Sequence, residues 1–474
     1  MENPSGSERW NRAGIEDNML AMFDASEAKD AHQDALDDRI AFLDAVRASS
    51  IVPEHGKPPT SKIFGAVFHM LRTGKSLELI MGSYKLLVDL DKHFPRVYLS
   101  DVDDCQSTSN SPSKLVVVKE AWSPIISCMD NATAAVSEVG GKQSSGPLDP
   151  SSFQLLIEEL TEILADINVQ AASVRPFQNM LLFQYIITVF EGDFLPRNDT
   201  LNWSMQRESL LNLLLVSRKI NYKSLMKNCM TIICQLSQHL QNECSKYLEQ
   251  ESSESQLSKN CYTALSLGLL VVLKNTRVSM EKLLVMIMDL DMARKKADIE
   301  GHTTRADGAR TPLMDIILDE LAYSKDAVPV FLKNFREPNW KLEIVVQYLW
   351  KYITKPSVCT RKSNDHAEDP TFDGALKCFS NKTGAKSLIK KLGADVVQFL
   401  LAHGFQAQLS MLSDGDADDN IAPDKEGRAS ALVDLCRTFI SAFDSLRSTY
   451  EHMEIVSIGK EALFAAAAII SMKS

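Results

Sequence analysis

The feature that most constrains this chain is the spacing of its apolar residues, which recur at helical intervals along almost the whole sequence. The clearest stretch follows Asp149 and Pro150, a pair typical of a helix start because aspartate caps free backbone amides and proline suits the first turn. After this pair one helical face is continuously apolar, with Phe153, Leu156, Ile157, Leu160, Ile163, Leu164 and Ile167. This period predicts an amphipathic helix that buries one face.

Two further segments carry equally clear helix signals. Thr311 and Pro312 mark a second helix start, and the apolar face that follows contains Leu313, Ile316, Ile317 and Leu321. The segment 339–353 is apolar on nearly all sides. We therefore expect it to lie centrally in the core, with Trp340 and Trp350 largely buried.

Similar patterns cover most of the remaining chain, and the alternation typical of strands is nearly absent. Helices are predicted over 35–50, 60–93, 174–191, 204–247, 256–274, 279–296, 384–411, 429–448 and 459–472. Polar, turn-rich loops are predicted near 103–114, 139–152, 251–259, 295–311, 358–371 and 413–428. Residues 1–34 are predicted to be a mostly disordered tail.

Helices joined in series by polar loops predict an all-α fold. In an armadillo/HEAT-like α-solenoid, each helix pair buries its apolar face on its neighbours. No clean internal repeat supports a regular array of this kind. We therefore expect an irregular helical stack, forming a single extended domain over 35–474.

Charge and composition restrict the classes of partner and compartment. The 474 residues contain 51 Lys and Arg against 62 Asp and Glu, a net charge of −11. This balance opposes sequence-independent wrapping of nucleic acid, so DNA contact should be weak, local or made through a partner.

The nine cysteines lack the spacing of a disulfide framework, and the first eighteen residues lack the pattern of a signal peptide. No apolar stretch reaches the length of a membrane span. We expect reduced thiols, a place in the cytosol or nucleus, and no membrane contact.

Two short motifs imitate ligand-binding loops and fail at a required position. Gly74-Lys75-Ser76 resembles the end of a phosphate-binding loop, but His69 stands where its first glycine is needed, and the preceding segment is predicted to be helical. The acidic run from Asp414 to Asp419 resembles a calcium loop until its sixth position, where Asp419 replaces glycine. We interpret both segments as ordinary polar sequence.

A third pattern suggests zinc. Cys229, Cys234, His239 and Cys244 are spaced by five residues, but steps of five on a helix point the side chains in different directions. No Ser, Cys or Thr lies in a recognisable nucleophile motif, although a triad assembled from distant residues stays open at this stage. We expect no enzymatic activity, metal, cofactor or small-molecule substrate.

Two stretches are locally basic. Between Arg294 and Arg310 there are five Lys or Arg and three acids, and between Lys351 and Lys391 there are nine and four. The first stretch includes the predicted loop 295–311, which is longer than loops in compact proteins usually are. These cations either form a solvated rim or bind phosphates or an acidic partner. The candidate partner-binding residues are Lys295, Lys296, Arg305, Arg310, Lys386, Lys390 and Lys391.

Long, idiosyncratic segments of the sequence resemble a known plant family, the negative regulators of systemic acquired resistance, also called suppressors of npr-one inducible genes. The resemblance is carried by residues 45–60, 202–227, 283–321, 339–356 and 379–405. It is weakest over 103–152, 249–259 and 413–428.

The resemblance implies a non-enzymatic nuclear scaffold with armadillo-like architecture that represses defence genes. It also implies a subunit of the SMC-five-six complex in an Nse-six-like role, with an Nse-five-like protein partner and links to DNA damage response and recombination. An alternative is a repressor that binds DNA directly through local basic patches. No helix-turn-helix, zinc-finger or basic-zipper signature favours that alternative.

Overall fold

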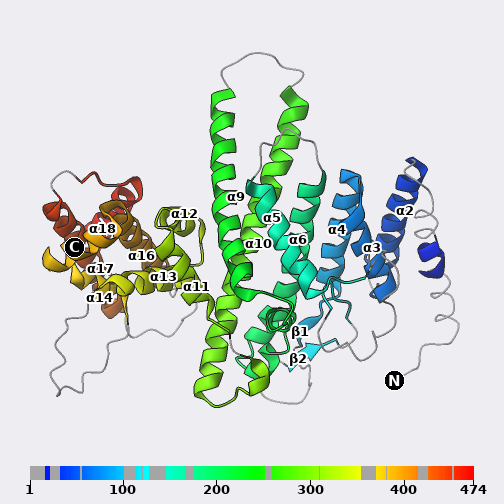
Figure 1. The fold of residues 1–474 in the computed structure, drawn as a ribbon, viewed down its shortest axis with the longest axis horizontal. Coiled ribbons are helices and arrows are strands. Elements are labelled where there is room, and N and C mark those ends of the chain that lie inside the picture. The colour runs from blue at the N-terminus through cyan, green and yellow to red at the C-terminus, as the bar shows by residue number, and fades with distance from the viewer. Residues whose placement is uncertain are drawn as a thin grey trace. The chain divides into compact units, whose positions relative to one another are not determined.

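The computed structural model describes residues 16–21, 33–53, 56–100, 114–118, 121–126, 146–165, 174–250, 259–308, 310–353, 370–379, 382–414, 425–450 and 453–473 (Figure 1). Helices form nearly all of this part of the chain, which confirms the predicted all-α helical stack. The chain divides into two compact units, residues 1–310 and 311–474, a division that the predicted single domain over 35–474 does not contain. Among the described helices, none combines the length and apolar character that a membrane span requires.

The first unit begins with α2 (Gln33–Ser50), α3 (Ser61–Thr73) and α4 (Leu77–His93), and both α2 and α3 pack on α4. The predicted single helix over 60–93 is broken at Gly74. The amide of Gly74 closes the last turn of α3 on the carbonyl oxygen of Met70 at 2.8 Å. A Cβ at this position would lie 2.7 Å from the same oxygen, so the tight exit from α3 requires glycine.

A short antiparallel ribbon follows α4, and the sequence did not predict it. Strand β1 (Val97–Ser100) pairs with β2 (Lys114–Val117), with Val97 opposite Val117. Four residues per strand are too few for a period of two to stand out from the surrounding pattern. Strand β1 packs on α6 (Val174–Asn198), so the ribbon covers part of the central helix of the unit.

The core of the first unit lies between α5 (Pro150–Ala165), α6, α9 (Tyr222–Gln250) and α10 (Lys259–Ile299). Figure 1 shows α9 and α10 as long helices lying side by side. The sequence predicted two helices over 256–274 and 279–296, but α10 is continuous because its middle is held from outside. Gln184 of α6 donates its amide to the Thr276 hydroxyl at 2.9 Å and to the Val272 carbonyl at 3.1 Å. This tertiary contact outweighs the low helix propensity of the local sequence.

The predicted helix over 204–247 is three helices, and polar side chains cap the starts of the first two. Asn202 accepts a hydrogen bond from the amide of Ser204 at 2.9 Å and begins α7 (Trp203–Gln206). Ser209 accepts from the amide of Asn212 at 3.3 Å and begins α8 (Leu210–Leu215). Asparagine and serine side chains at these positions satisfy helix-end amides that would otherwise lack partners.

A buried carboxylate joins these short helices to the core. Asp193 of α6 has a side chain only 1% exposed, and it accepts from the amide of Leu210 at 2.7 Å. The guanidinium groups of Arg197 and Arg96 each lie 3.3 Å from Asp193 Oδ1. Asp193 therefore connects α6 to the N-terminus of α8 through charge-assisted hydrogen bonds from Arg197 and Leu210, and to the segment before β1 through an ion pair with Arg96.

The second unit contains eight described helices: α11 (Leu313–Tyr323), α12 (Ala327–Asn334), α13 (Pro338–Tyr352), α14 (Phe372–Cys378), α15 (Lys382–Leu392), α16 (Ala394–Asp414), α17 (Lys425–Thr449) and α18 (Ser457–Lys473). The predicted helix over 384–411 is divided between α15 and α16 by Gly393. Its φ of +91° lies in the left-handed region that glycine adopts without strain.

Helix α13 confirms the predicted helix over 339–353 and packs against α16 and α14. Its fully buried aromatic residue is Tyr348, whose hydroxyl donates to the carbonyl of Leu321 at 3.2 Å. Trp340 and Trp350 are only partly covered. The indole of Trp350 donates to the carbonyl of Thr371 at 3.2 Å, so this side chain lies at the edge of the helix pair.

Several predicted non-helical segments fall outside the described residues. These are residues 1–15 and 22–32 of the predicted tail and most of the predicted loops 103–114, 251–259, 358–371 and 413–428, including the acidic run after Asp414. Within the tail, residues 16–21 are helical and Met19 is buried. Of the predicted loop 139–152, residues 146–149 are described as non-helical, and α5 begins at Pro150.

The Asp193 cluster gives a stability prediction. Asp193→Ala would leave the Arg197 side chain, 3% exposed, without its carboxylate. Removing one partner of a buried ion pair should lower the free energy of unfolding by about 3 to 5 kcal/mol, measured by urea unfolding. The control is Asp199→Ala, because Asp199 follows the same helix and is exposed; it should change stability by less than about 0.5 kcal/mol. Equal stability of the two variants would contradict this role of Asp193.

Candidate functional site: basic surfaces and a polar pocket

The predicted loop 295–311 is shorter and more ordered than the sequence indicated. Lys295 and Lys296 lie in the last turns of α10, which ends at Ile299. Gly301 and Gly308 have φ values of +74° and +65° and bracket a 3₁₀ turn over Arg305–Asp307. Both positions have the left-handed backbone that glycine favours.

Side chains fix this turn to the rest of the first unit. The amide of Thr304 donates to Asp307 Oδ2 at 2.6 Å, and the Thr304 hydroxyl donates to the same oxygen at 3.1 Å. Asp307 also lies 3.5 Å from Arg207, which follows α7, and its own side chain is 3% exposed. Arg294 donates to the carbonyl of Gly308. The turn is thus capped locally and tied to two helices.

Arg310 lies inside the fold. Its Nη2 and Nε atoms are 2.6 and 2.9 Å from Asp291 Oδ1, and the two side chains are only 8% and 12% exposed. The guanidinium also stacks over the ring of Tyr222, 5.5 Å from its centroid, and Nη1 lies 3.5 Å from Asn212 Oδ1. Because this charge is paired and desolvated, we do not carry Arg310 forward as a partner-binding residue.

The other three candidates of this segment are on the surface. Lys295, Lys296 and Arg305 are all exposed. Two acids nearby are engaged locally, since Asp298 accepts from the Thr303 hydroxyl and Glu300 lies 3.3 Å from His302. We call Lys295, Lys296 and Arg305 the α10 cation group. That they bind a partner stays a prediction.

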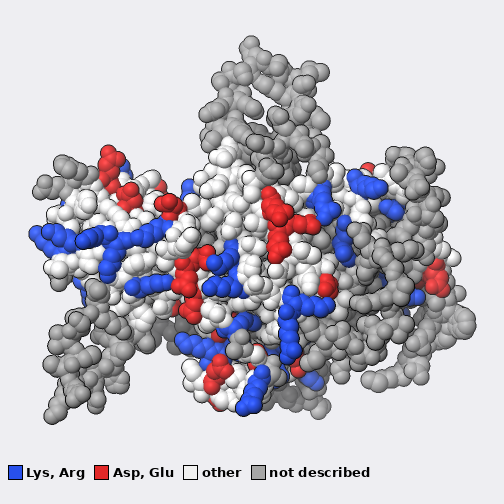
Figure 2. All heavy atoms as spheres, in the orientation of Figure 1, with Lys and Arg blue, Asp and Glu red and all other residues white. Residues whose placement is uncertain are grey.

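In the second unit, Lys386, Lys390 and Lys391 all belong to α15 and are exposed. Lys391 donates its ammonium to the carbonyl of Tyr352 at 3.1 Å, so part of its hydrogen-bonding capacity is used within the unit. Figure 2 shows a band of Lys and Arg side chains across the face of the C-terminal unit. The net-negative chain therefore presents a locally basic surface there.

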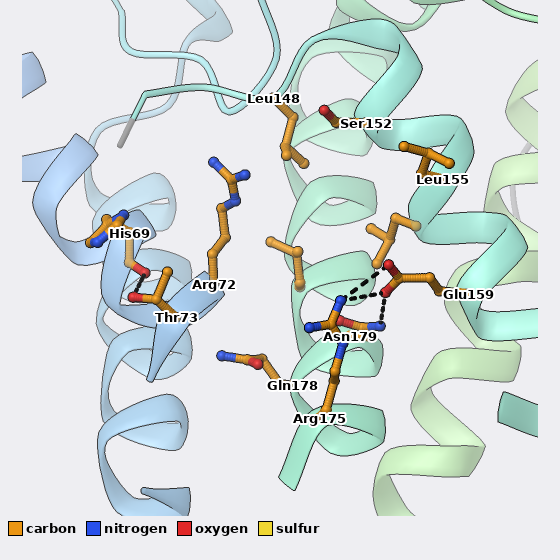
Figure 3. A pocket seen from close by; sticks show the side chains of 12 residues that line it. His69, Arg72, Thr73, Leu148, Ser152, Leu155, Glu159, Arg175, Gln178 and Asn179 are labelled. Carbon is orange, nitrogen blue, oxygen red and sulfur yellow. Dashed lines mark hydrogen bonds and ion pairs between the residues drawn. The ribbon is translucent and has the colours of Figure 1, made fainter. Parts of the chain in front are cut away.

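A pocket of about 320 Å³, which the sequence did not predict, opens between α3, α5 and α6 (Figure 3). It is lined by His69, Arg72, Thr73, Leu148, Ser152, Leu155, Leu156, Glu159, Arg175, Gln178, Asn179 and Leu182. No single segment supplies this set, which explains why no local motif announced it.

The polar groups of the pocket largely bind one another. Glu159 accepts from Asn179 at 2.8 Å and from Arg175 at 3.1 and 3.2 Å. Gln178 donates to the carbonyls of Leu71 and Gly74, at 2.8 and 3.2 Å, and thereby satisfies the C-terminal end of α3.

Arg72 is the partly buried cation of the pocket. It donates to the carbonyl of Gly146 at 3.0 Å, and burial lowers its pKa while the Asp149 carboxylate opposes that effect. Together these contacts indicate a seam that holds three helices together rather than a reactive centre.

The described residues of the remaining sequence motifs lie at a helix junction or are packed within the first unit. Gly74 and Ser76 lie at the junction of α3 and α4, with no phosphate-cradling loop among these residues. Burial raises the pKa of the Cys229 thiol to about 12 and that of Cys234 to about 11, which disfavours reactive thiolates. His239 contacts the carbonyl of Leu164 at 2.8 Å, and the side chain of Cys244 lies outside the described residues. Within the part of the chain that the structure describes, no three or more His, Cys, Asp or Glu side chains are grouped to hold a metal.

Comparisons with known proteins are consistent along the chain. A family model described as the SNI1 middle domain matches residues 96–337, and one described as the SNI1 C-terminal domain matches residues 353–474. The chain is 41% identical over 468 residues to a protein of Arabidopsis thaliana named "Negative regulator of systemic acquired resistance SNI1". That alignment covers 97% of this chain and 95% of the Arabidopsis protein. No solved structure matches the chain.

The Arg310 geometry gives a second stability prediction, in which two arginines of one segment differ. Arg310→Ala should lower the free energy of unfolding by about 3 kcal/mol or more, because it removes the guanidinium that pairs with the Asp291 carboxylate, only 12% exposed. Arg305→Ala should change it by less than about 0.5 kcal/mol, because Arg305 is exposed. Chemical denaturation of both variants measures the difference. A neutral Arg310→Ala would place that side chain on the surface instead.

Proposed function

This chain belongs to the SNI1 family, and we propose on that basis that it is a negative regulator of systemic acquired resistance. The observation that carries the proposal is the alignment with the Arabidopsis regulator, which extends over nearly the full length of both chains at 41% identity. Two family models also match residues 96–337 and 353–474, and these ranges include parts of both compact units. An alignment of this extent leaves no large part of the Arabidopsis regulator without a counterpart here.

We propose that the chain acts by holding partners rather than by chemistry. Helical stacks offer broad surfaces on which several partners can dock at once. In this chain Asp193 and Arg310 are engaged by other side chains of the fold. The exposed cations of α10 and α15 are among the groups that can meet another molecule.

The finer parts of the proposal come from the sequence resemblance. We propose a nuclear protein that represses defence genes and serves as the Nse-six-like subunit of the SMC-five-six complex, beside an Nse-five-like partner. Roles in DNA damage response and recombination would follow from that membership. The long segments that carry the resemblance support this proposal, and two of them, 283–321 and 379–405, include the α10 cation group and α15.

We further propose that the α10 cation group contacts an acidic surface of a protein partner. The turn that carries Arg305 is held by Asp307 and Arg294, so the exposed guanidinium projects from a fixed backbone. A fixed backbone reduces the ordering cost of binding. Arginine and lysine donors of this kind form charge-assisted hydrogen bonds with carboxylates.

Complementation tests the regulatory function. In Arabidopsis plants that lack the related regulator, expression of this chain should return defence-gene transcripts to the low uninduced level of wild-type plants. The control is Asp193→Ala, which should complement poorly because less folded protein accumulates. Unchanged high transcripts, with the parent chain present at normal abundance in nuclei, would contradict the proposal.

A further inference from the structure

Helix α15 carries a row of lysines that its own folding does not require. Lys382, Lys386 and Lys390 recur every four residues, so they share one helical face and span about 12 Å along the axis. All three are exposed. The opposite face is apolar and buried, with Ala385, Leu388, Ile389 and Leu392, and it packs on α16 and α17. We call Lys382, Lys386 and Lys390 the lysine row.

The sequence around the lysine row contains few acids. Helix α15 has four lysines and no acid, and between Thr371 and His403 the sequence holds only Asp373 and Asp395. Asp373 is paired with Lys377 at 2.6 Å. Lys325 donates to the carbonyl of Lys391, which brings a further lysine to the C-terminal end of the helix.

Helix electrostatics explain only part of this pattern. Lysines in the last turn stabilise a helix because they interact favourably with its negative end, which accounts for Lys390 and Lys391. Lys382 is the first residue of α15, where a cation is unfavourable, and the first turn contains no acid. The charge at this end is therefore a cost to the isolated helix, and binding of an anion would offset it.

We propose that the lysine row binds the phosphate backbone of duplex DNA. Every large apolar side chain of α15 is buried, so the row offers a protein partner no apolar anchor of the kind that dominates protein interfaces. A phosphate backbone needs only positive charges, and one DNA strand presents about one phosphate per 3.4 Å of axis, or three to four over the row. Lysines act there as point charges without reading base sequence.

This inference deepens the proposed function. The binding of a phosphate backbone is argued from the lysine row itself, and only the choice of DNA over RNA rests on the proposed function. It specifies contact that is weak and sequence-independent. The net charge of −11 limits the affinity, because the rest of the chain repels the same polyanion. The contact should therefore be sensitive to salt and should serve to position a scaffold that protein partners bring to DNA.

Fluorescence anisotropy of a labelled duplex with the full-length chain tests the inference, at salt concentrations from about 50 to 200 mM. The parent should bind with an affinity that falls linearly with salt on logarithmic axes. The triple variant Lys382→Ala, Lys386→Ala, Lys390→Ala should bind at least about tenfold more weakly at the lowest salt, with a slope smaller by up to about 2.7. The triple Lys→Arg variant should bind like the parent, because it keeps the charges.

The matched control is Lys57→Ala, Lys62→Ala, Lys75→Ala, which removes three exposed lysines of the first unit and changes the net charge equally. It should bind like the parent, and all variants should share the parent's melting temperature. Three outcomes would overturn the inference: a parent chain that does not bind, an unaffected alanine variant of the row, or an equal loss in the control. Binding of duplex RNA with no binding of DNA would overturn the choice of DNA. Because binding is measured on the isolated protein, its failure is distinct from a failure of complementation in plants.

Discussion

Pairing of buried charges where helices meet is the interaction on which the N-terminal unit depends. Asp193 binds Arg96, Arg197 and the first amide of α8, and Asp291 binds Arg310 at the end of the unit. Apolar packing brings helices together without fixing how each begins and ends. These carboxylates satisfy backbone amides and guanidinium groups that could not be buried alone. The short helices α7 and α8 and the turn after α10 keep their places for this reason.

The same pairing separates structural cations from those able to bind partners. Arg310 and Arg305 stand five residues apart in one basic segment, yet the first is 8% exposed beside Asp291 and the second lies open to solvent. Lys391 likewise donates to a carbonyl of its own unit, whereas Lys382 and Lys386 are exposed and form no ion pair with a described residue. In the scaffold role that we propose, the exposed cations bind partners, and the buried ion pairs keep the surface in a fixed geometry.

Local sequence predicted the helices that local interactions define. The helices α5, α11 and α13 follow Asp-Pro, Thr-Pro and apolar patterns that need no distant partner. Helix breaks were harder to predict. Gly74 ends α3 through a close backbone contact, and Gly393 ends α15 with a left-handed φ. Helix α10 is continuous where two helices were predicted, and Gln184 of α6, 92 residues away in sequence, contacts Thr276 at that point.

The candidate site shows the same limit. Sequence identified the basic segment but could not assign its arginines, because the groups that bury Arg310 come from Asp291, Tyr222 and Asn212, on three other stretches of the chain. The pocket between α3, α5 and α6 is likewise a product of tertiary packing. The number of charged residues can be counted from the sequence. Which of them are paired and which are exposed can be seen only in the folded structure.

The central claim is that the exposed cations bind partners while the buried ones hold the fold, and affinity purification from plant nuclei tests it most directly. The variant Lys295→Glu, Lys296→Glu, Arg305→Glu is compared with the parent and with Lys57→Glu, Lys62→Glu, Lys75→Glu, which makes the same charge change elsewhere on the surface. The account predicts that the first variant keeps the parent's melting temperature and loses SMC-five-six subunits from the purified complex, while the control retains them. Full recovery of those subunits with the first variant, or an equal loss with the control, would contradict it.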